Sequence, residues 1–199
     1  MSAEVRNPSE APGELELVRR FVNTLDIEAV TDEIGTPAEA RAWLDREGWR
    51  AKVGERELRE LLQLRESLRD LVSLRGTDGD LDAVAAVDAI ARRHPLVVRL
   101  SAPGVLSPTD ETGVGGFIQH VLAIVAAAEI DGSWDRMKAC ANHGCRWLFY
   151  DHSRNRSRTW CTMDLCGSQA KMRRYRSRRS AGAAVGSSRL RPPTALGFH

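Results

Sequence analysis

The four cysteines of this chain, Cys140, Cys145, Cys161 and Cys166, all fall within 27 of its 199 residues. They form two pairs with the spacing C-x4-C-x15-C-x4-C. Two pairs separated by a loop of this length can place four thiolates at the corners of a tetrahedron, which is the geometry that Zn²⁺ takes in structural sites. Because four protein ligands leave no open position for water, the spacing predicts one structural zinc ion whose binding is coupled to the folding of this segment.

The same residues allow other interpretations. Four reduced buried thiols, two disulfides, or a catalytic cysteine beside a histidine would also use them. No charged start followed by an apolar run opens the chain, so we expect no signal peptide and a cytoplasmic protein, in which thiols stay reduced or hold metal. His143 and His152 could substitute as ligands, although each cysteine pair already supplies two sulfur atoms.

Charge is divided unevenly along the chain. Residues 136–180 carry a net charge of +10, residues 1–135 carry −10, and arginine supplies 26 of the 29 basic side chains. The arginine excess and the abundant alanine indicate a GC-rich bacterial genome. An acidic body joined to a basic C-terminal module is typical of a nucleic-acid-binding protein, although a merely solvated basic surface would have the same composition.

The region before the cysteines predicts a mainly α (α+β) fold with a small β element. Leu15, Val18, Val22 and Leu25 recur at helical spacing, and Thr36, Pro37 and Glu39 form a helix start that Gly48 ends. Further helices are predicted over about 55–75, 81–93 and 114–130, with a short strand in LVVRL before the last of them. The last helix is too short and too interrupted for a membrane span and is expected to be buried. We expect a flexible arm (1–13), a helical domain (14–132), the cysteine module ending in a basic helix (136–180) and a disordered tail (181–199).

No convincing active site is evident in the helical domain, and we expect that the protein is not an enzyme. The carboxylates Asp26, Glu28, Asp32 and Glu33 fit a solvated turn as well as a catalytic pair, and His120 fits a core position. A substrate pocket between the helices would favour the enzyme hypothesis. The sequence leaves open a small-molecule effector in this domain and a homodimer.

The segment CANHGCRWLFYDHSRNRSRTWCTMDLCGSQAKMRRYRSRR resembles the CGNR zinc finger family in its cysteine pairs, its W-x-F-x-D-x-SRN-x-SR motif and its basic ending. Proteins of that family typically carry an N-terminal ABATE domain and are described as stress-induced transcription regulators. FVNTLD and TPAEARAWL resemble that domain more loosely. The resemblance implies a regulator that binds double-stranded DNA. Ser168 and Gln169 replace the Asn-Arg of the family motif, and Thr159 replaces another arginine, so affinity or target choice is expected to differ.

Arginine suits nucleic acid because its rigid fork pairs with phosphate oxygens or with guanine. We expect contacts from the loop between the cysteine pairs and from the helix near Ser168, which Ser168 would cap. An RNA-binding or protein-interaction module is the alternative to DNA binding. Trp147, Phe149 and Trp160 are expected to pack beneath the metal, with base stacking as the alternative. The predicted nucleic-acid-binding residues are Arg154, Arg156, Arg158, Lys171, Arg173, Arg174, Arg176, Arg178 and Arg179, of which Lys171, Arg174 and Arg178 share one helix face.

Overall fold

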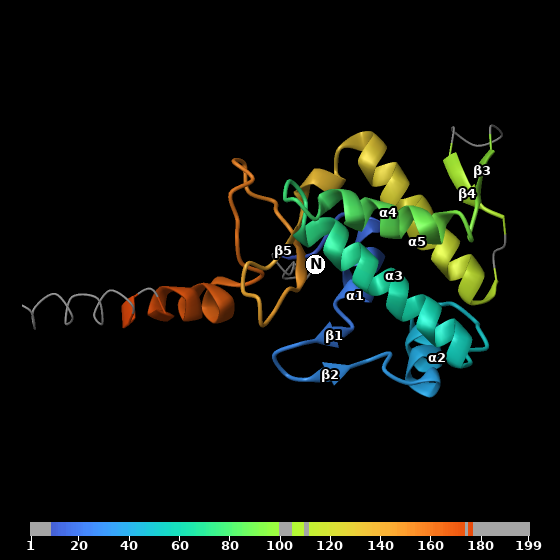
Figure 1. Ribbon diagram of the computed structural model, residues 1–199, viewed down its shortest axis with the longest axis horizontal. Coiled ribbons are helices and arrows are strands. Elements are labelled where there is room, and N and C mark those ends of the chain that lie inside the picture. The colour runs from blue at the N-terminus through green and yellow to red at the C-terminus, as the bar shows by residue number, and fades with distance from the viewer. Residues whose placement is uncertain (1–8, 100–104, 110–111, 174, 177–199) are drawn as a thin grey trace, which may run out of the picture. The chain divides into compact units, whose positions relative to one another are not determined.

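The computed structural model describes residues 9–99, 105–109, 112–173 and 175–176. The chain divides into two compact units, one ending at Cys161 and the other beginning at Thr162. Five helices of the first unit account for most of its regular structure, which confirms the mainly α prediction (Figure 1). They are α1 (Leu15–Val22), α2 (Pro37–Arg46), α3 (Glu55–Ser73), α4 (Asp80–Ala91) and α5 (Gly113–Asp131).

The described residues of the first unit also form three two-stranded antiparallel sheets. Two of them are local hairpins of the helical region. The third pairs the strand that follows the 3-10 turn η1 (Trp134–Arg136) with a strand between Cys145 and Cys161. The strands are β1 (Leu25–Asp26), β2 (Thr31–Asp32), β3 (Leu96–Arg99), β4 (Val105–Pro108), β5 (Met137–Ala139) and β6 (Leu148–Tyr150). The second unit contains the π-helical turn η2 (Met163–Gly167), after which residues 168–173 are helical.

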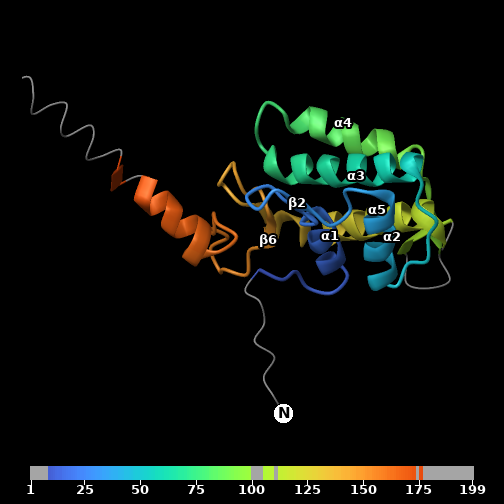
Figure 2. The same ribbon diagram turned by 90° about the horizontal axis from the view of Figure 1, so that it is seen from below.

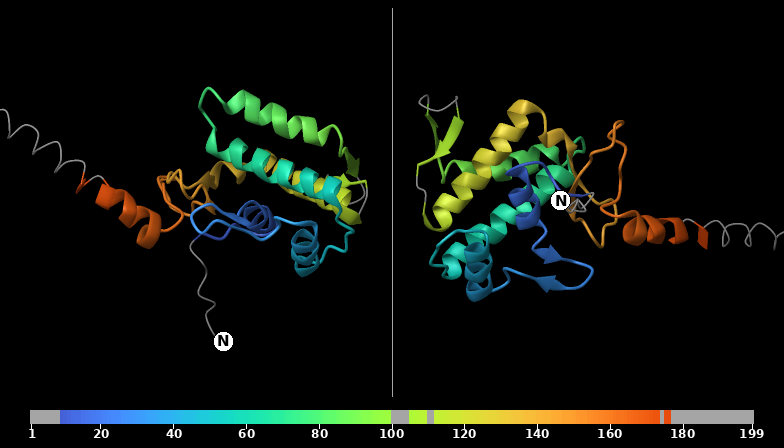
Figure 3. Two further views of the ribbon diagram at one scale, coloured as in Figure 1. Left: turned by 60° about the horizontal axis from the view of Figure 1, so that its bottom comes forward. Right: turned by 180° about the vertical axis from the view of Figure 1, so that it is seen from behind.

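The helices of the first unit pack around an aromatic cluster. α3 and α4 lie side by side, and α2 runs at a steep angle to α3 (Figures 2 and 3). Phe21 of α1 meets Phe117 of α5 with ring centroids 5.2 Å apart, and Trp43 of α2 lies 5.7 Å from Phe21 and 5.8 Å from Phe117. The two contacts of Phe117 are edge-to-face and that of Phe21 with Trp43 is tilted, and aromatic pairs at these distances add to the burial of large apolar surfaces. Two shorter helices, α1 and α2, are thereby fixed to the long helix α5.

The predicted helix ends are largely confirmed. Thr36 Oγ1 accepts a hydrogen bond from the N–H of Glu39 at 3.3 Å, and Gly48 beyond the other end has a φ of +84°, which an L side chain rarely adopts. Leu25 is an exception, because α1 ends at Val22 and Leu25 lies in β1. The strand predicted within LVVRL corresponds to β3, which pairs with β4.

Helix α5 is long and apolar enough to cross a membrane by length and composition alone, with a mean hydropathy of 1.6. Val114, Phe117, Ile118, Val121 and Val125 are nevertheless buried in the common core with α1 and α3. The central helix of a globular domain also meets the criterion of length and composition for a membrane span. The burial of α5 therefore favours its predicted role as a core helix.

The strands β5 and β6, which flank the first cysteine pair, share this hydrophobic core with the helices. Met137 and Leu148 are fully buried and Tyr150 is 7% exposed, and all three belong to the same hydrophobic cluster as the helices. The first compact unit therefore extends through Cys161, past residue 132, where the predicted helical domain ends. Of the predicted arm, Ser9 and Ala11 are buried, whereas residues 1–8 and the predicted tail (181–199) lie outside the described residues.

Candidate metal centre and nucleic-acid interface

The sulfur atoms of Cys140, Cys145, Cys161 and Cys166 all lie within 4.8 Å of one another, and all four side chains are buried. Cys145 Sγ and Cys161 Sγ are 3.7 Å apart. Zn–S bonds of about 2.3 Å in a tetrahedron place sulfur atoms about 3.8 Å apart, whereas a disulfide needs about 2.05 Å. The geometry therefore fits one four-thiolate zinc ion and excludes a Cys145–Cys161 disulfide.

Backbone hydrogen bonds hold the first cysteine pair in a tight turn. The N–H groups of Cys145 and Arg146 both donate to the carbonyl oxygen of Asn142, at 2.8 and 3.0 Å, and Arg146 has a left-handed φ of 54°. The N–H of Cys140 donates to the carbonyl of Trp147 at 2.9 Å. Hydrogen bonds with the thiols of Cys145 and Cys161 lower the pKa of Cys140, which favours the thiolate form that a metal requires.

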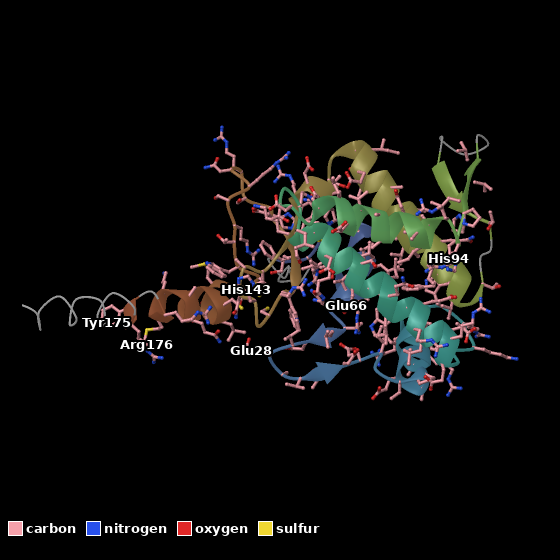
Figure 4. The ribbon with its side chains drawn as sticks, viewed as in Figure 1. Glu28, Glu66, His94, His143, Tyr175 and Arg176 are labelled. Carbon is pink, nitrogen blue, oxygen red and sulfur yellow. The ribbon has the colours of Figure 1, made fainter. Side chains whose placement is uncertain are left out.

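Neither histidine of the segment belongs to the thiol cluster. His143 is exposed on the turn between the first two cysteines (Figure 4). His152 Nε2 lies 2.7 Å from the carbonyl oxygen of Glu10, and its ring packs on Tyr150 with centroids 4.8 Å apart. These positions agree with the expectation that the two cysteine pairs supply all four ligands.

Asp151 organises the loop that follows β6. Its carboxylate is fully buried and accepts hydrogen bonds from Lys138 Nζ at 2.8 Å and from the N–H groups of Ser153 and Arg158, both at 2.9 Å. Burial alone would raise the pKa of this carboxyl, but the hydrogen bonds from Lys138, Ser153 and Arg158 outweigh it and lower the pKa well below its usual range. The sequence offered a sign of this role, since Asp151 is one of only two acids among residues 136–180.

The three arginines of the loop have different surroundings. Arg154 and Arg156 are exposed, whereas Arg158 is half-buried and its Cζ lies 4.8 Å from the centroid of the Phe149 ring. Its guanidinium donates to the carbonyl of Trp160 at 2.9 Å, to the hydroxyl of Ser9 at 2.8 Å and to the carbonyl of Cys161. Arg158 thus makes structural contacts within the protein, and its role as a nucleic-acid contact stays a prediction.

Residues far away in sequence support the metal centre. The hydroxyl of Ser9 donates to the carbonyl oxygen of Cys161 at 2.8 Å, and the carbonyl of Ser9 accepts from the N–H of Tyr150 at 3.1 Å. The side chain of Asn23, just after α1, hydrogen-bonds both backbone groups of Leu148, at 2.8 and 2.7 Å. Each short contact ties the cysteine segment to the N-terminal part of the chain.

A family model named ABATE, described as "Putative stress-induced transcription regulator", matches residues 15–131. The chain belongs to the ABATE family. A model of the CGNR zinc finger matches residues 136–179, directly after it. No curated protein gives a significant match. Together with the thiol geometry, the CGNR match identifies the metal as a single structural zinc ion, as the sequence predicted.

A charge network centred on the buried Arg69 connects the ABATE helices to the CGNR finger within the first unit. Arg69 of α3, whose side chain is 0% exposed, donates to the carbonyl of Val22 at 2.6 Å and to the carbonyl of Arg146 at 3.1 Å. Arg146 in turn pairs with Asp70 at 2.6 Å, and Glu66, labelled on α3 in Figure 4, pairs with Arg69 at 3.0 Å. Sequence reasoning missed these residues, because a buried arginine on a helix cannot be told from a solvated one by spacing.

The aromatic residues of the finger differ in burial. Phe149 is fully buried, which agrees with core packing, whereas Trp147 and Trp160 are half-buried. The indole nitrogen Nε1 of Trp147 is buried without a hydrogen-bond partner in the described part of the chain.

In the second unit, Lys171, Arg173 and Arg176 are exposed, and Figure 4 shows Arg176. The predicted contacts Arg174, Arg178 and Arg179 lie outside the described residues. Ser168 does not cap the helix as an N-cap residue would, because its backbone is already helical (φ −67°, ψ −43°) and its hydroxyl donates to the carbonyls of Asp164 and Leu165.

The acidic residues of the ABATE part take structural positions. Asp32 forms a two-pronged ion pair with Arg65, at 2.6 and 2.9 Å, and Glu33 pairs with Arg46 at 2.7 Å. His120 is half-buried with its ring 5.3 Å from that of Trp49. Each of these contacts is one that a core or surface residue makes, so none of them provides evidence of catalysis.

Proposed function

We propose that this protein is a transcription regulator that binds double-stranded DNA through its CGNR finger and has no enzymatic activity. The observation that carries the proposal is the loop at residues 151–158, in which Arg154 and Arg156 are exposed while the backbone is tied to buried groups. Exposed arginines on an ordered loop can pair with phosphate oxygens without the entropy loss of ordering that loop on binding.

The family membership and the charge distribution support the same function. Lys171, Arg173 and Arg176 of the second unit add exposed cations to those of the loop in the first unit. Phosphate contacts of this kind set affinity and salt dependence, and base contacts set sequence choice. The ABATE domain would bind an effector or a second copy of the chain in the cytoplasm.

Selection from fragmented genomic DNA and from a random duplex library tests the proposal. The zinc-loaded protein is expected to enrich a short shared sequence, and the chelated protein is the control. Enrichment that disappears on chelation supports specific DNA binding. If the zinc-loaded protein enriches nothing, the RNA-binding or protein-interaction function replaces this one.

A further inference from the structure

Asp151 is the only buried acidic side chain in the part of the chain that the structure describes. One carboxylate oxygen accepts from the N–H of Ser153, and the other accepts from the N–H of Arg158 and from Lys138 Nζ. Both ends of the segment 153–158 are therefore fixed to a single side chain.

Cations of the preceding strand region hold the carbonyl groups of the same loop. Lys138 Nζ donates to the carbonyls of Arg156 and Arg158, and Arg136 Nη1 donates to the carbonyls of Asp151 and Ser153, at 3.0 and 3.2 Å. Arg156 is held with a φ of 49°, a conformation that a non-glycine residue keeps only where its surroundings enforce it. With its backbone fixed in this way, the loop exposes the side chains of Arg154 and Arg156.

We propose that Asp151 is the positioning residue of the DNA interface, acting through Arg154 and Arg156 without touching DNA. This inference rests on the proposed function. By charge alone, an anion beneath a phosphate-binding loop weakens DNA binding. Asp151 has the opposite net effect because it fixes the loop before DNA arrives and so removes an ordering cost from binding.

The substitution Asp151→Asn separates these two effects. It keeps the shape of the side chain but replaces one acceptor oxygen by an NH2 group. In either orientation of the amide, this NH2 group faces a donor: the N–H of Ser153, or the N–H of Arg158 and Lys138 Nζ. The matched control is Asp164→Asn, which neutralises the other acid of the finger at an exposed position. Charge alone predicts tighter duplex binding for both variants. Positioning predicts that Asp164→Asn binds as well as the wild type or better, while the DNA affinity of Asp151→Asn falls on the order of tenfold for each arginine–phosphate pair that no longer forms.

Binding is measured with zinc-loaded full-length protein and a duplex, by titration at several salt concentrations. For Asp151→Asn the slope of log K against log[salt] is expected to flatten by about 0.9 for each of the two arginines. Zinc content, measured by metal analysis, should stay at one ion per chain. Amide hydrogen exchange of Ser153 and Arg158 should accelerate without DNA present, because their acceptor is impaired.

A double-mutant cycle distinguishes positioning from a general loss of structure. In a protein that already carries Arg154→Ala and Arg156→Ala, Asp151→Asn should cause little further decrease in DNA affinity. If Asp151→Asn lowers DNA affinity equally in both backgrounds, or raises it as much as Asp164→Asn does, the inference is wrong although the protein still binds DNA. If the two alanine substitutions themselves change nothing, the proposed role of the loop fails instead.

A second variant covers the case in which Asp151→Asn does not fold. Lys138→Gln removes the ammonium that binds Asp151 and two loop carbonyls, and it leaves all four cysteines in place. The same cycle is expected, with a decrease in DNA affinity that disappears in the double-alanine background. A decrease of equal size in both backgrounds would count against positioning.

Discussion

Removal of zinc should destabilise the ABATE helices as well as the CGNR finger. Met137, Leu148 and Tyr150 belong to the core of the helical region, and their segment is cross-linked by Cys140 and Cys161 through the metal. Strands of three residues each provide little independent stability once that cross-link is removed. We therefore expect the β5–β6 hairpin to leave the core in a substantial part of the metal-free population.

The size of the effect follows from the burial of these three side chains. Burying a large apolar side chain contributes roughly 1.5–3 kcal/mol, so three of them contribute about 5–9 kcal/mol as an upper bound. A domain has only about 5–15 kcal/mol of unfolding free energy in total. At about 2–4 °C per kcal/mol for a chain of this size, this upper bound corresponds to a fall of about 10–36 °C in the melting temperature of the helices.

Circular dichroism at 222 nm during heating measures this effect, because nearly all the described helix of the first unit precedes the finger. Zinc-loaded protein, chelated protein and Cys161→Ser are compared, with His143→Ala as a control that alters an exposed histidine of the same finger. Chelation and Cys161→Ser should lower the transition, and His143→Ala should not. Helices of the metal-free protein that melt within about 2 °C of the zinc-loaded protein would show that the shared core is not energetically coupled to the metal.

Three further predictions concern ion pairs and hydrogen bonds within the first unit. Asn23→Ala removes two hydrogen bonds to the backbone of Leu148 and should lower the free energy of unfolding by about 2–3 kcal/mol in a single denaturant transition; two separate transitions would contradict it. Arg69→Met leaves the carbonyl groups of Val22 and Arg146 without this donor and should cost about 2–4 kcal/mol by the same measurement, whereas a cost below about 1 kcal/mol would show that the network relaxes. For Asp32, burial raises the pKa, but the hydrogen bonds and charge of Arg65 lower it overall, so its contribution is present above the unfolded pKa of about 3.8 and disappears as the pH falls through the lower folded value. Denaturant melts should therefore show that Asp32→Asn is less stable than the wild type at about pH 6 and that the difference shrinks below about pH 4; a constant difference would remove the ion pair as its cause.

The sequence predicted best those features that are set by neighbouring residues. The start of α2 depends on Thr36, Pro37 and Glu39, which lie within four positions of one another, and its capping hydrogen bond is present as expected. The cysteine spacing likewise predicted a zinc site, because tetrahedral thiolate coordination restricts the loop lengths that can close it. Both are local rules that the remainder of the fold does not override.

Features that depend on distant partners could not be predicted in this way. The sequence places Ser9 in a flexible arm, yet its hydroxyl contacts the carbonyl of Cys161, 152 positions away. By sequence, Arg158 is equivalent to Arg154 and Arg156, and only its contacts with Phe149 and Ser9 distinguish it as a half-buried residue. A basic motif gives the number of cations, but the fold decides which of them remain exposed for a ligand.

Ser9 and Arg158 also contact the backbone of a zinc ligand. The guanidinium of Arg158 donates to the hydroxyl of Ser9, and both side chains donate to the carbonyl oxygen of Cys161. The arginine loop and a zinc ligand are therefore fixed by the same small group of atoms. Because the Asp151 carboxylate holds the N–H of Arg158 in the same loop, a change that releases zinc should also release Arg154 and Arg156 from their ordered positions. DNA affinity and zinc occupancy are then expected to fall together in a chelator titration. DNA binding that persists unchanged after the zinc has left would separate the loop from the metal and contradict this coupling.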